Sequence, residues 1–452
     1  MSIAARDLEA TRTRLAGIVG QAGVTSGREM DISSAQGEAA PLVVSPADES
    51  QTVEIARLAQ AEKIPVIVWG AGTKQDVEPI QPLDGIVLHT GGLSDTIELD
   101  ADNLTVTVGA GKVLDDLQRE LGAVKLFLPL DPVDSARATV GGTLAANTSG
   151  PNRLLYRTAR DLVLGVRVAT PLGTLVRAGG KTVKDVAGYD MKKLYIGSWG
   201  TLGAITAATF RLLPLPETRA TVAMVFPQLP SACAAVSALL ASFMRPSSAE
   251  LLSSGALPAS AEQDLRLGPG EYLLAVCVEG AVEDTERQKR DLAELASSHG
   301  AREVSILEGA PESRFWQDRK AALAPVSASR PSALIKGSVP LTQVLNFTSA
   351  VVALENQGLR PAFAAHAGNG IVYALVAAES DGAEKLAPAV NRLQQLAAES
   401  GGFALLQKAA SDVVAKVQLW PPRSDYGLMR ELKSHLDPNN LWNPARTPGG
   451  RI

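Results

Sequence analysis

The chain has 452 residues, a formal net charge of -5 and 46% hydrophobic residues, which is typical of a globular protein with two or more domains. The mildly acidic charge disfavours nucleic-acid binding through a basic surface. No apolar run reaches the roughly 18 to 20 residues of a membrane-spanning helix, and no apolar signal core follows the charged N-terminus. A cytoplasmic location is predicted, with peripheral membrane association through a complex as the open alternative.

Residues 1–36 predict an N-terminal helix followed by a polar linker. The segment Glu49–Lys63 has small and apolar residues near helical spacing, and Ser45 and Asp48 are candidate caps before it. Ile64–Trp69 is a short apolar run rich in β-branched residues, which predicts a buried parallel strand. A helix and a strand in this order indicate a β-α-β lobe at the start of a domain that spans residues 37–216.

A glycine-rich loop follows this strand. Glycines allow positive φ angles and let a ligand approach the backbone. Successive N–H groups in such a turn form an anion nest, and Thr73 and Lys74 add a hydroxyl and a charge, which suits a pyrophosphate. The loop matches neither GxGxxG nor the Walker pattern, which disfavours a Rossmann or P-loop site and leaves a tight surface turn as the alternative. The candidate cofactor-binding residues here are Trp69, Gly70, Ala71, Gly72, Thr73, Lys74 and Gln75.

A second run of small residues extends from Thr139 to Gly150. Small side chains are needed where a flat ring system or its ribityl chain lies against the backbone, although a helix that packs closely through Ala and Gly has the same composition. Just upstream, two prolines fix an extended turn at Leu128–Pro132, which could brace Leu130 and Asp131 near the same ligand. The candidates from this region are Leu130, Asp131, Thr139, Val140, Gly141, Gly142, Thr143, Ala146, Ser149 and Gly150.

The rest of this domain predicts strands and two more glycine patches. Leu104–Val108 alternates as a strand does, and residues 162–175 predict a hairpin. The patches are Lys184–Asp190 and Gly197–Thr206. Four such patches have no obvious packing reason, so they favour a shell of backbone amides around one large, doubly phosphorylated ligand, for which FAD is the best candidate. The last patch contributes Gly200, Thr201, Gly203, Ala204 and Ile205.

Residues 217–420 alternate short apolar strands with helices, which predicts a ferredoxin-like α/β sandwich acting as a cap. No internal sequence repeat is evident. Asp425–Leu436 predicts a last helix that Asp437-Pro438 ends, and residues 421–452 are expected to return to the first domain, where Asn443 is a further candidate ligand. Cys233 and Cys277 lie in apolar runs without CxxC spacing, so neither zinc nor an iron–sulfur cluster is predicted.

Six segments, in order along the chain, resemble the FAD-linked oxidases of the vanillyl-alcohol oxidase and p-cresol methylhydroxylase superfamily. Within it, the chain is similar to the branch of glycolate oxidases and D-lactate dehydrogenases, and in particular to the smaller FAD-binding subunit of glycolate oxidase complexes. The resemblance implies an α+β fold, in which a two-lobed FAD-binding domain of the PCMH type carries a ferredoxin-like α/β cap. The six segments are 69–75, 139–150, 160–165, 184–190, 197–206 and 436–444.

Two departures from this pattern bear on the chemistry. Trp199 stands where the branch usually carries Glu, which the smaller glycolate oxidase subunit also lacks. Self-sufficient dehydrogenases carry His-x-Gly-x-Gly-x-x-His, a spacing that suits a metal or a catalytic base. Here His366 is present, Tyr373 replaces the second His, and the later Glu-His pair is missing around 401–410, so no metal site is predicted. His366 is a candidate residue facing the flavin, with a structural histidine as the alternative.

The segment Trp316–Lys320 resembles the Trp-x-x-Arg-Lys stretch of the family, which implies that Arg319 grips a substrate carboxylate. A bidentate guanidinium–carboxylate pair explains the preference for Arg, whereas an amphipathic helix with a solvated basic face is the alternative. Lys336 stands where the larger subunit tends to have Asp, and a cation there would help to hold an acid or would contact another subunit. The candidate catalytic residues are His366, Arg319, Lys336 and Tyr373.

The resemblance implies hydride transfer from a small 2-hydroxy acid, glycolate or D-lactate, to FAD and on to another acceptor. The loop at residues 70–74 lacks the His of an RxGGH anchor, so noncovalent FAD is expected. Implied partners are a larger FAD subunit and an iron–sulfur subunit. Two alternatives stay open: a subunit that binds FAD and relays electrons or scaffolds without its own substrate oxidation, and an interaction protein that has lost the flavin.

Overall fold

The computed structural model describes residues 8–32, 40, 42–74, 85–181, 189–257, 265, 267–322, 331–379, 382–444 and 446. The chain divides into two compact units. The first unit comprises Met1–Ser149, Thr158–Leu215 and Pro422–Ile452, and the second comprises Gly150–Arg157 and Pro216–Pro421.

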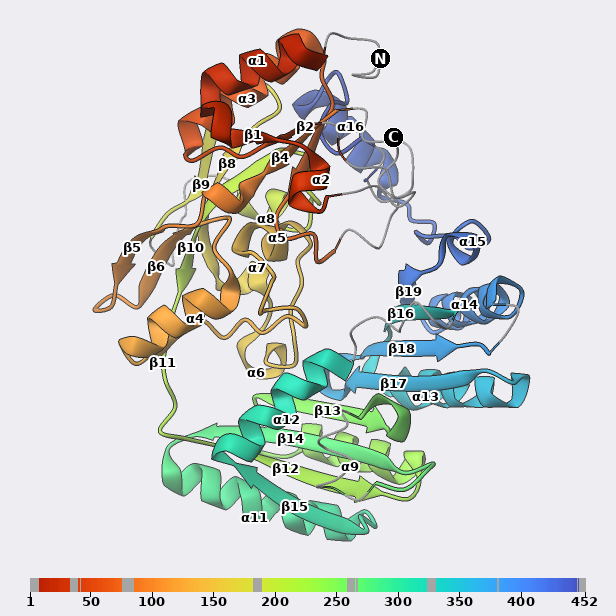
Figure 1. Ribbon diagram of the computed structural model, residues 1–452. Coiled ribbons are helices and arrows are strands. Elements are labelled where there is room, and N and C mark those ends of the chain that lie inside the picture. Colours follow the sequence, from red (N-terminus) through yellow and green to blue (C-terminus); the bar gives the residue numbers. More distant parts are fainter. Residues whose placement is uncertain are drawn as a thin grey trace. The chain divides into compact units, whose positions relative to one another are not determined.

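The first lobe of the first unit is a four-stranded sheet with strand order β1-β2-β4-β3, in which β3 and β2 run parallel to β4 (Figure 1). Helix α3 begins where predicted, because the Asp48 carboxylate accepts a hydrogen bond from the Gln51 N–H at 2.8 Å. Its Ile55, Ala56 and Ala59 are buried in the core of this lobe. The elements are α1 Leu8–Val19, β1 Val24–Thr25, α2 Gly27–Met30, β2 Leu42–Val44, α3 Glu49–Glu62, β3 Val66–Trp69 and β4 Ile86–His89.

The second lobe is a five-stranded antiparallel sheet with order β5-β6-β10-β8-β9, and the predicted hairpin at residues 162–175 is its pair β8–β9. A separate short pair joins β7 Leu126–Phe127 to β11 Leu213–Pro214. The sheet strands are β5 Thr96–Asp100, β6 Thr105–Gly109, β8 Val163–Ala169, β9 Leu175–Gly179 and β10 Ala204–Arg211. The helices of the lobe are α4 Leu114–Ala123, α5 Val140–Ala145, α7 Ala159–Leu162 and α8 Lys192–Tyr195.

The C-terminal segment belongs to the first unit. Helix α16, Tyr426–Leu436, places the buried Lys433 so that its Nζ donates to the carbonyl oxygens of Thr201 and Trp442, each at 2.7 Å, and to the carboxylate of Asp437. Trp442 is fully buried and forms a parallel bridge with Val66 of β3. The tail is therefore part of the first unit's core.

The second unit is built on an eight-stranded antiparallel sheet (Figure 1). Its first half follows the order β12-α9-β13-β14-α11-β15 and its second half β16-α13-β17-β18-α14-β19, which is the ferredoxin-like arrangement twice over. The sheet order β15-β12-β14-β13-β17-β18-β16-β19 shows that the halves are mirrored and joined edge to edge by β13 and β17. The cap prediction named one such sandwich and missed the repeat.

The strands of this unit are β12 Thr218–Phe226, β13 Ser248–Ser253, β14 Tyr272–Gly280, β15 Glu303–Glu308, β16 Ser332–Ser338, β17 Arg360–His366, β18 Ile371–Ala377 and β19 Phe403–Ala409. The helices are α6 Arg153–Tyr156, α9 Leu229–Ala241, α11 Val282–Ser298, α12 Gly309–Ala322, α13 Val344–Ala353, α14 Gly382–Glu399 and α15 Ser411–Val414. Because α12 links the two halves, it has no counterpart within either of them.

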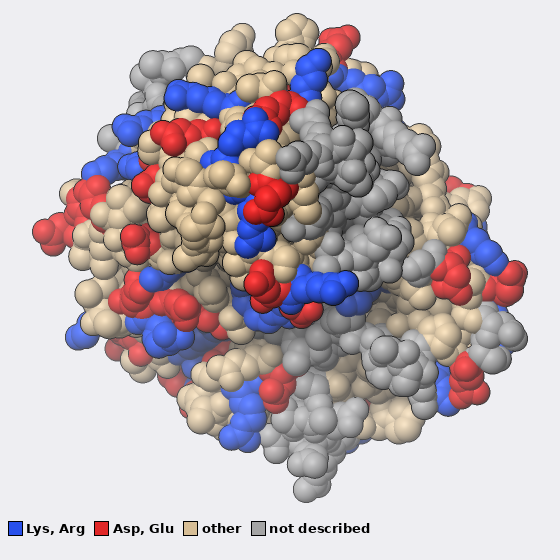
Figure 2. Space-filling model, turned by 45° about the horizontal axis from the view of Figure 1, so that its top comes forward, with Lys and Arg blue, Asp and Glu red and all other residues tan. Residues whose placement is uncertain are grey.

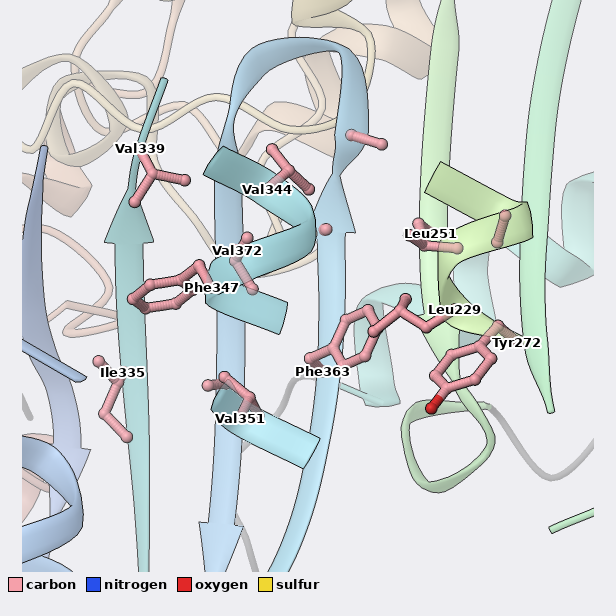
Figure 3. Packing of buried hydrophobic residues seen from close by; sticks show 14 of the residues in the cluster. Leu229, Leu251, Tyr272, Ile335, Val339, Val344, Phe347, Val351, Phe363 and Val372 are labelled. Atoms are coloured by element: carbon pink, nitrogen blue, oxygen red, sulfur yellow. The ribbon is translucent and has the colours of Figure 1, made fainter. Parts of the chain in front are cut away.

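One face of the eight-stranded sheet forms the apolar core with α9, α11, α13 and α14. In Figure 3, Val344, Phe347 and Val351 of α13 point toward the sheet, and Leu229 lies beside Phe363. Since side chains alternate between the faces of a strand, residues next to these core positions are directed to the opposite face. That face carries polar side chains and contacts α12, as described below.

The surface shown in Figure 2 has acidic and basic side chains interspersed, in keeping with the small net charge. In the part of the chain that the structure describes, none of the helices has both the length and the apolar character needed to span a bilayer.

Candidate cofactor cleft and polar cluster

The first unit contains a cleft with an empty volume of about 640 Å³, including its part open to solvent, which we call the cofactor cleft. Strand β3 ends at its edge, the loop after β3 and the start of α5 form its walls, and the segment before β10 closes it. Its lining residues are Val68, Gly70, Ala71, Gly72, Thr73, Lys74, Thr90, Thr139, Gly141, Gly142, Ala145, Ala146, Trp199, Gly200, Gly203, Ile205, Asn443 and Arg446.

Several glycines of the cleft are required by packing. A Cβ on Gly70 would lie 2.4 Å from the Thr139 hydroxyl, and one on Gly141 would lie 2.7 Å from the Cβ of Ala110. The structure thus corrects the prediction that these small residues have no packing reason, because Gly70 and Gly141 let two loops approach closely. Gly142 differs: among the described residues, a Cβ there would have only the Thr139 hydroxyl within 4 Å, at 3.1 Å. Its small size therefore leaves space in the cleft.

The walls of the cleft are held together by Asn443. Its Oδ1 accepts from the Val68 N–H at 2.8 Å, and its Nδ2 donates to the Trp199 carbonyl. Trp199 takes a left-handed conformation with φ 55°, and its N–H donates to the Ala145 carbonyl at 2.9 Å. The Trp that replaces the family's Glu is therefore a lining residue whose backbone links α5 to the C-terminal segment.

The residues present fit a ligand with phosphates. Gly72 has φ +70°, so the loop after β3 takes a conformation that glycine favours and that is typical of anion-binding turns. Lys74 and Arg446 bring two cations to the lining, and the Lys74 Nζ lies 2.8 Å from the Asp134 carboxylate. Small residues of α5 supply a flat wall. This combination suits the pyrophosphate and the ring system of FAD.

Many predicted cofactor-binding residues line the cleft, and others do not. Leu130, Val140, Thr143, Thr201 and Ala204 are buried in the surrounding structure, and Ser149 accepts a hydrogen bond from the Ala159 N–H at 3.2 Å. Trp69 and Asp131 are also outside the lining, Gly150 belongs to the second unit, and Gln75 and Lys184–Gly188 lie outside the described residues. The predicted residues in the lining are Gly70, Ala71, Gly72, Thr73, Lys74, Thr139, Gly141, Gly142, Ala146, Gly200, Gly203, Ile205 and Asn443.

Sequence reasoning did not select five lining residues: Val68, Thr90, Ala145, Trp199 and Arg446. Val68 and Thr90 belong to or follow neighbouring parallel strands, whose carboxyl ends meet at one edge of the sheet. That rule could have found them. Arg446 follows Asn443 by three residues, and a cation beside a predicted phosphate site was the available signal.

The polar face of the second unit's sheet carries a group of five side chains, which we call the polar cluster. Glu250 of β13 stands directly opposite His366 of β17, and Lys336 of β16 stands opposite Tyr373 of β18. Arg319 comes from α12. The structure thus brings together all four predicted catalytic residues, which are distant in sequence, and adds Glu250.

Helix α12 holds Arg319 at the polar face of the sheet, because one face of the helix is fixed there. Glu312 accepts from the Arg219 Nε at 2.8 Å, and the Trp316 Nε1 donates to the Thr221 hydroxyl at 2.9 Å. Arg319 follows at the same spacing of three to four residues, and its Nη2 donates to the Glu250 carboxylate. Arg319 is 1% exposed, so the alternative of a solvated basic face does not apply at this residue.

His366 is also 1% exposed, and its Nδ1 is hydrogen-bonded to the Glu250 carboxylate. Burial lowers the pKa of His366; Glu250 raises it, Arg319 and Lys336 lower it, and the net direction is down. The imidazole is therefore neutral at pH 7. Among the described residues, no group hydrogen-bonds its Nε2, or the Nε and Nη1 of Arg319. The polar cluster thus holds a buried base and two buried donors that have no hydrogen-bond partner in the described chain.

Tyr373 and Lys336 complete the polar cluster. The rings of His366 and Tyr373 meet edge to face, with centroids 5.4 Å apart and an interplanar angle of 72°. The Lys336 Nζ lies 5.9 Å from the centre of the Tyr373 ring, a cation–π distance. Tyr373, at the position where the resemblance implies a second histidine, is thus an aromatic ring in contact with His366. No set of three His, Cys, Asp or Glu side chains suited to a metal ion occurs in the described ranges.

Two family models match this chain: "FAD binding domain" over residues 40–179 and "FAD linked oxidases, C-terminal domain" over residues 215–404 and 421–447. Among solved structures, p-cresol methylhydroxylase matches with a TM-score of 0.75 and 15% identity, covering 96% of each chain. This likeness confirms the predicted α+β fold of the PCMH type.

Three curated relatives are similar in sequence. Glycolate oxidase subunit GlcD of Bacillus subtilis is 27% identical over 414 residues, which cover 89% of this chain and 88% of the relative. D-lactate dehydrogenase of Archaeoglobus fulgidus is 28% identical, with 90% of each chain covered. Glycolate oxidase subunit GlcE of Escherichia coli is 33% identical over 172 residues, covering 38% of this chain and 49% of the relative.

Proposed function

Because the chain belongs to the FAD-linked oxidases, we propose that it oxidises a small 2-hydroxy acid, glycolate or D-lactate, and passes the electrons through FAD to another acceptor. The names of the relatives, glycolate oxidase subunit and D-lactate dehydrogenase, support this substrate class. The observation that carries the proposal is the polar cluster, in which a neutral imidazole nitrogen and two guanidinium nitrogens are buried without a partner in the described chain.

FAD, when bound, supplies the electron acceptor for the two electrons and the hydrogen that leave the substrate carbon. The N–H groups of the loop Gly70–Lys74, together with Lys74 and Arg446, would hold its pyrophosphate. The small residues of α5, above all Gly142, would leave room for its ring system or ribityl chain.

In this proposal each residue of the polar cluster has a defined task. Arg319 binds the substrate carboxylate through its Nη1, since its Nη2 already donates to Glu250 and its Nε–H points away from the Nη1 side of the guanidinium. The Nε2 of His366 accepts the proton of the substrate hydroxyl as the α-hydrogen leaves. General-base assistance of this kind contributes about 10² to 10⁴ in rate. The product is the corresponding 2-oxo acid, and the proton remains on His366 until it passes to solvent.

We further propose that the chain works as one subunit of a complex, with a larger FAD subunit and an iron–sulfur subunit, in the cytoplasm or at the inner face of the membrane. The matches to two glycolate oxidase subunits support this arrangement. Co-purification of a tagged chain with proteins from its own cells tests it: a second flavoprotein and an iron–sulfur protein are expected at fixed ratios, and a chain that stays alone would contradict it.

A second candidate function is that of an FAD-binding subunit that relays electrons or scaffolds without oxidising a substrate itself. Two observations favour it. The Glu250 carboxylate already neutralises Arg319, which weakens the attraction of the guanidinium for a substrate anion. Tyr373 also stands in place of the second histidine of the self-sufficient dehydrogenases.

One experiment separates the two functions. The chain is purified with FAD, and its oxidised-flavin absorption is followed during anaerobic addition of glycolate, D-lactate and, as a control without a hydroxyl, acetate. Loss of the oxidised band with a hydroxy acid, but not with acetate, is expected for the dehydrogenase. A flavoprotein that stays oxidised with every acid, yet accepts electrons from a chemical reductant, would support the relay instead.

A further inference from the structure

Glu250 lies at the seam between the two ferredoxin-like halves of the second unit. The halves meet only through the antiparallel pair β13–β17, among the strand pairings of the described residues, and Glu250 and His366 are directly opposite each other in that pair. Every residue of β13 is buried, and Glu250 is the sole charged residue in it. A carboxylate at such a position is costly unless both of its oxygens have partners.

Each oxygen of Glu250 serves a different member of the polar cluster. Oε1 is hydrogen-bonded to the Nδ1 of His366, and Oε2 accepts from the Nη2 of Arg319. A carboxylate only accepts hydrogen bonds, so the Nδ1 that faces it must carry the hydrogen. The neutral imidazole then has its lone pair on Nε2, the nitrogen without a partner in the described structure.

We infer that Glu250 is a positioning residue: it holds His366 in the Nδ1–H tautomer, so that Nε2 can accept a proton, and it anchors Arg319 by one nitrogen, so that the other two are left for a ligand. The same division of labour is known from carboxylates that orient a catalytic or metal-bound histidine through its second nitrogen. The catalytic consequence rests on the proposed function, whereas the tautomer does not.

The substitution Glu250→Gln tests this inference, because it predicts a specific change of the His366 tautomer. An amide has one accepting oxygen and one donating nitrogen, so it can serve only one of the two partners. The charged guanidinium forms the stronger hydrogen bond and takes the oxygen. The amide NH₂ then faces Nδ1 of His366, which becomes an acceptor, and the hydrogen moves to Nε2. The variant is thus expected to invert the tautomer and remove the base.

The test is ¹⁵N NMR of the histidine rings in the full-length, FAD-loaded chain. Comparison with His366→Gln assigns the signals of His366 among the four histidines. The wild type is expected to show a protonated Nδ1 and a bare Nε2, and Glu250→Gln the reverse. A wild-type His366 with its hydrogen on Nε2 overturns the inference without any variant, even if Glu250→Gln does not fold.

Glu279→Gln is the matched control, because Glu279 of β14 is another buried carboxylate of the same unit that pairs with an arginine, Arg219, and it does not belong to α12. It should lower stability and leave the His366 tautomer unchanged. If both variants change the tautomer alike, the effect is general loosening and the inference fails. Glu250→Asp, which keeps a carboxylate, should retain the wild-type tautomer.

The kinetic readout separates this inference from the proposed function. Glu250→Gln is expected to slow flavin reduction by a 2-hydroxy acid by about 10² or more, with KM rising less than the rate falls, and Glu279→Gln should change the rate by only about two- to threefold. A wild type that no hydroxy acid reduces, but whose tautomer inverts in Glu250→Gln, overturns the proposed function and leaves the positioning role standing. An inverted tautomer with an unchanged reduction rate overturns the catalytic role of the positioning.

Discussion

The cofactor cleft and the polar cluster are built in opposite ways. The cleft is made mainly of backbone and small residues, contributed by short runs such as Gly70–Lys74 and Thr139–Ala146. The cluster is made of five large polar side chains that come singly from β13, α12, β16, β17 and β18. A site made of backbone depends on what is absent at each position, whereas a site made of side chains depends on which group is present.

This contrast predicts different responses to mutation. In the cleft, an added side chain should abolish binding without touching the chemistry. In the polar cluster, a side chain of similar size but different chemistry should abolish turnover while the flavin remains bound. Four changes test the contrast, beginning with the largest expected effect.

His366→Gln should reduce the rate of flavin reduction by glycolate or D-lactate by about 10² to 10⁴, because it removes the imidazole Nε2 that accepts the hydroxyl proton. FAD content should match the wild type, since His366 belongs to the second unit and the cofactor cleft to the first. Stopped-flow absorbance gives the rate, and the flavin-to-protein absorbance ratio gives the content. A variant that is reduced at the wild-type rate would assign His366 a structural role only.

Gly142→Leu should weaken FAD binding by about 10² or more, because a leucine side chain would extend into the cleft from α5. Overlapping a ligand with several heavy atoms removes contacts that are each a fraction of a kcal/mol. Flavin fluorescence titration of the apoprotein measures the change. Gly122→Leu is the matched control: Gly122 is also helical, and a Cβ there would have no atom of the described chain within 4 Å. Equal losses in both variants would point to misfolding instead.

The same contrast explains what the sequence could predict. Glycine runs are local, so the loop after β3 and the start of α5 were found directly. Lining residues on neighbouring elements, such as Thr90 and Arg446, are brought in by the fold and were missed. The four predicted members of the polar cluster came from the family resemblance, not from their spacing. Glu250 has no local signal beyond a single charge in a buried strand, and its function depends on a register that only the folded sheet supplies.

The repeat in the second unit was missed for a related reason. The two ferredoxin-like halves share the order of their elements and the alternation of core and polar positions, and both requirements can be met by many sequences.

Packing alone also accounts for Gly70 and Gly141, so those glycines are weaker evidence for a ligand than Gly142. The sequence could not separate the two kinds of glycine, because the separation depends on which backbone lies opposite.

Stability should depend on pH through His366. Its pKa is lowered in the folded chain, mainly by burial, whereas in the unfolded chain it is near the ordinary value of about 6.5. As pH falls, the unfolded chain therefore binds a proton at a higher pH than the folded chain does. The contribution of the neutral imidazole to the free energy of unfolding is fully present above about pH 6.5 and is lost as pH falls toward the folded-state pKa. One proton gives at most about 1.4 kcal/mol per pH unit.

Urea unfolding at pH 7.5 and pH 5.5 measures this contribution. The midpoint of the wild type should fall more between the two pH values than that of His366→Gln, which has no proton to bind there. His89→Gln serves as a comparison, because burial also lowers the pKa of His89, in the first unit. An equal pH response of wild type and His366→Gln would mean that the pKa of His366 is the same in the folded and the unfolded chain.

The smallest effect is expected for Lys336→Met. Lys336 is partly exposed and lies over the Tyr373 ring, and it has no carboxylate partner among the described residues. Because Glu250 neutralises Arg319, Lys336 is the cation of the polar cluster that remains uncompensated, and a substrate carboxylate would be drawn to it. An exposed ion pair contributes about 0.2 to 1 kcal/mol, so KM should rise about two- to fivefold at low salt with little change in kcat.

Lys385→Met, on the exposed side of α14, removes an equal charge from the other side of the sheet and should leave KM unchanged. The difference between the two variants should shrink as salt is added, because the Debye length falls to about 8 Å at physiological ionic strength. A kcat that falls with Lys336→Met while KM holds would instead place Lys336 in the chemical step. In that case Lys336 would act on the reacting groups, and Arg319 would bind the carboxylate of the acid without help from Lys336, although Glu250 neutralises the charge of Arg319.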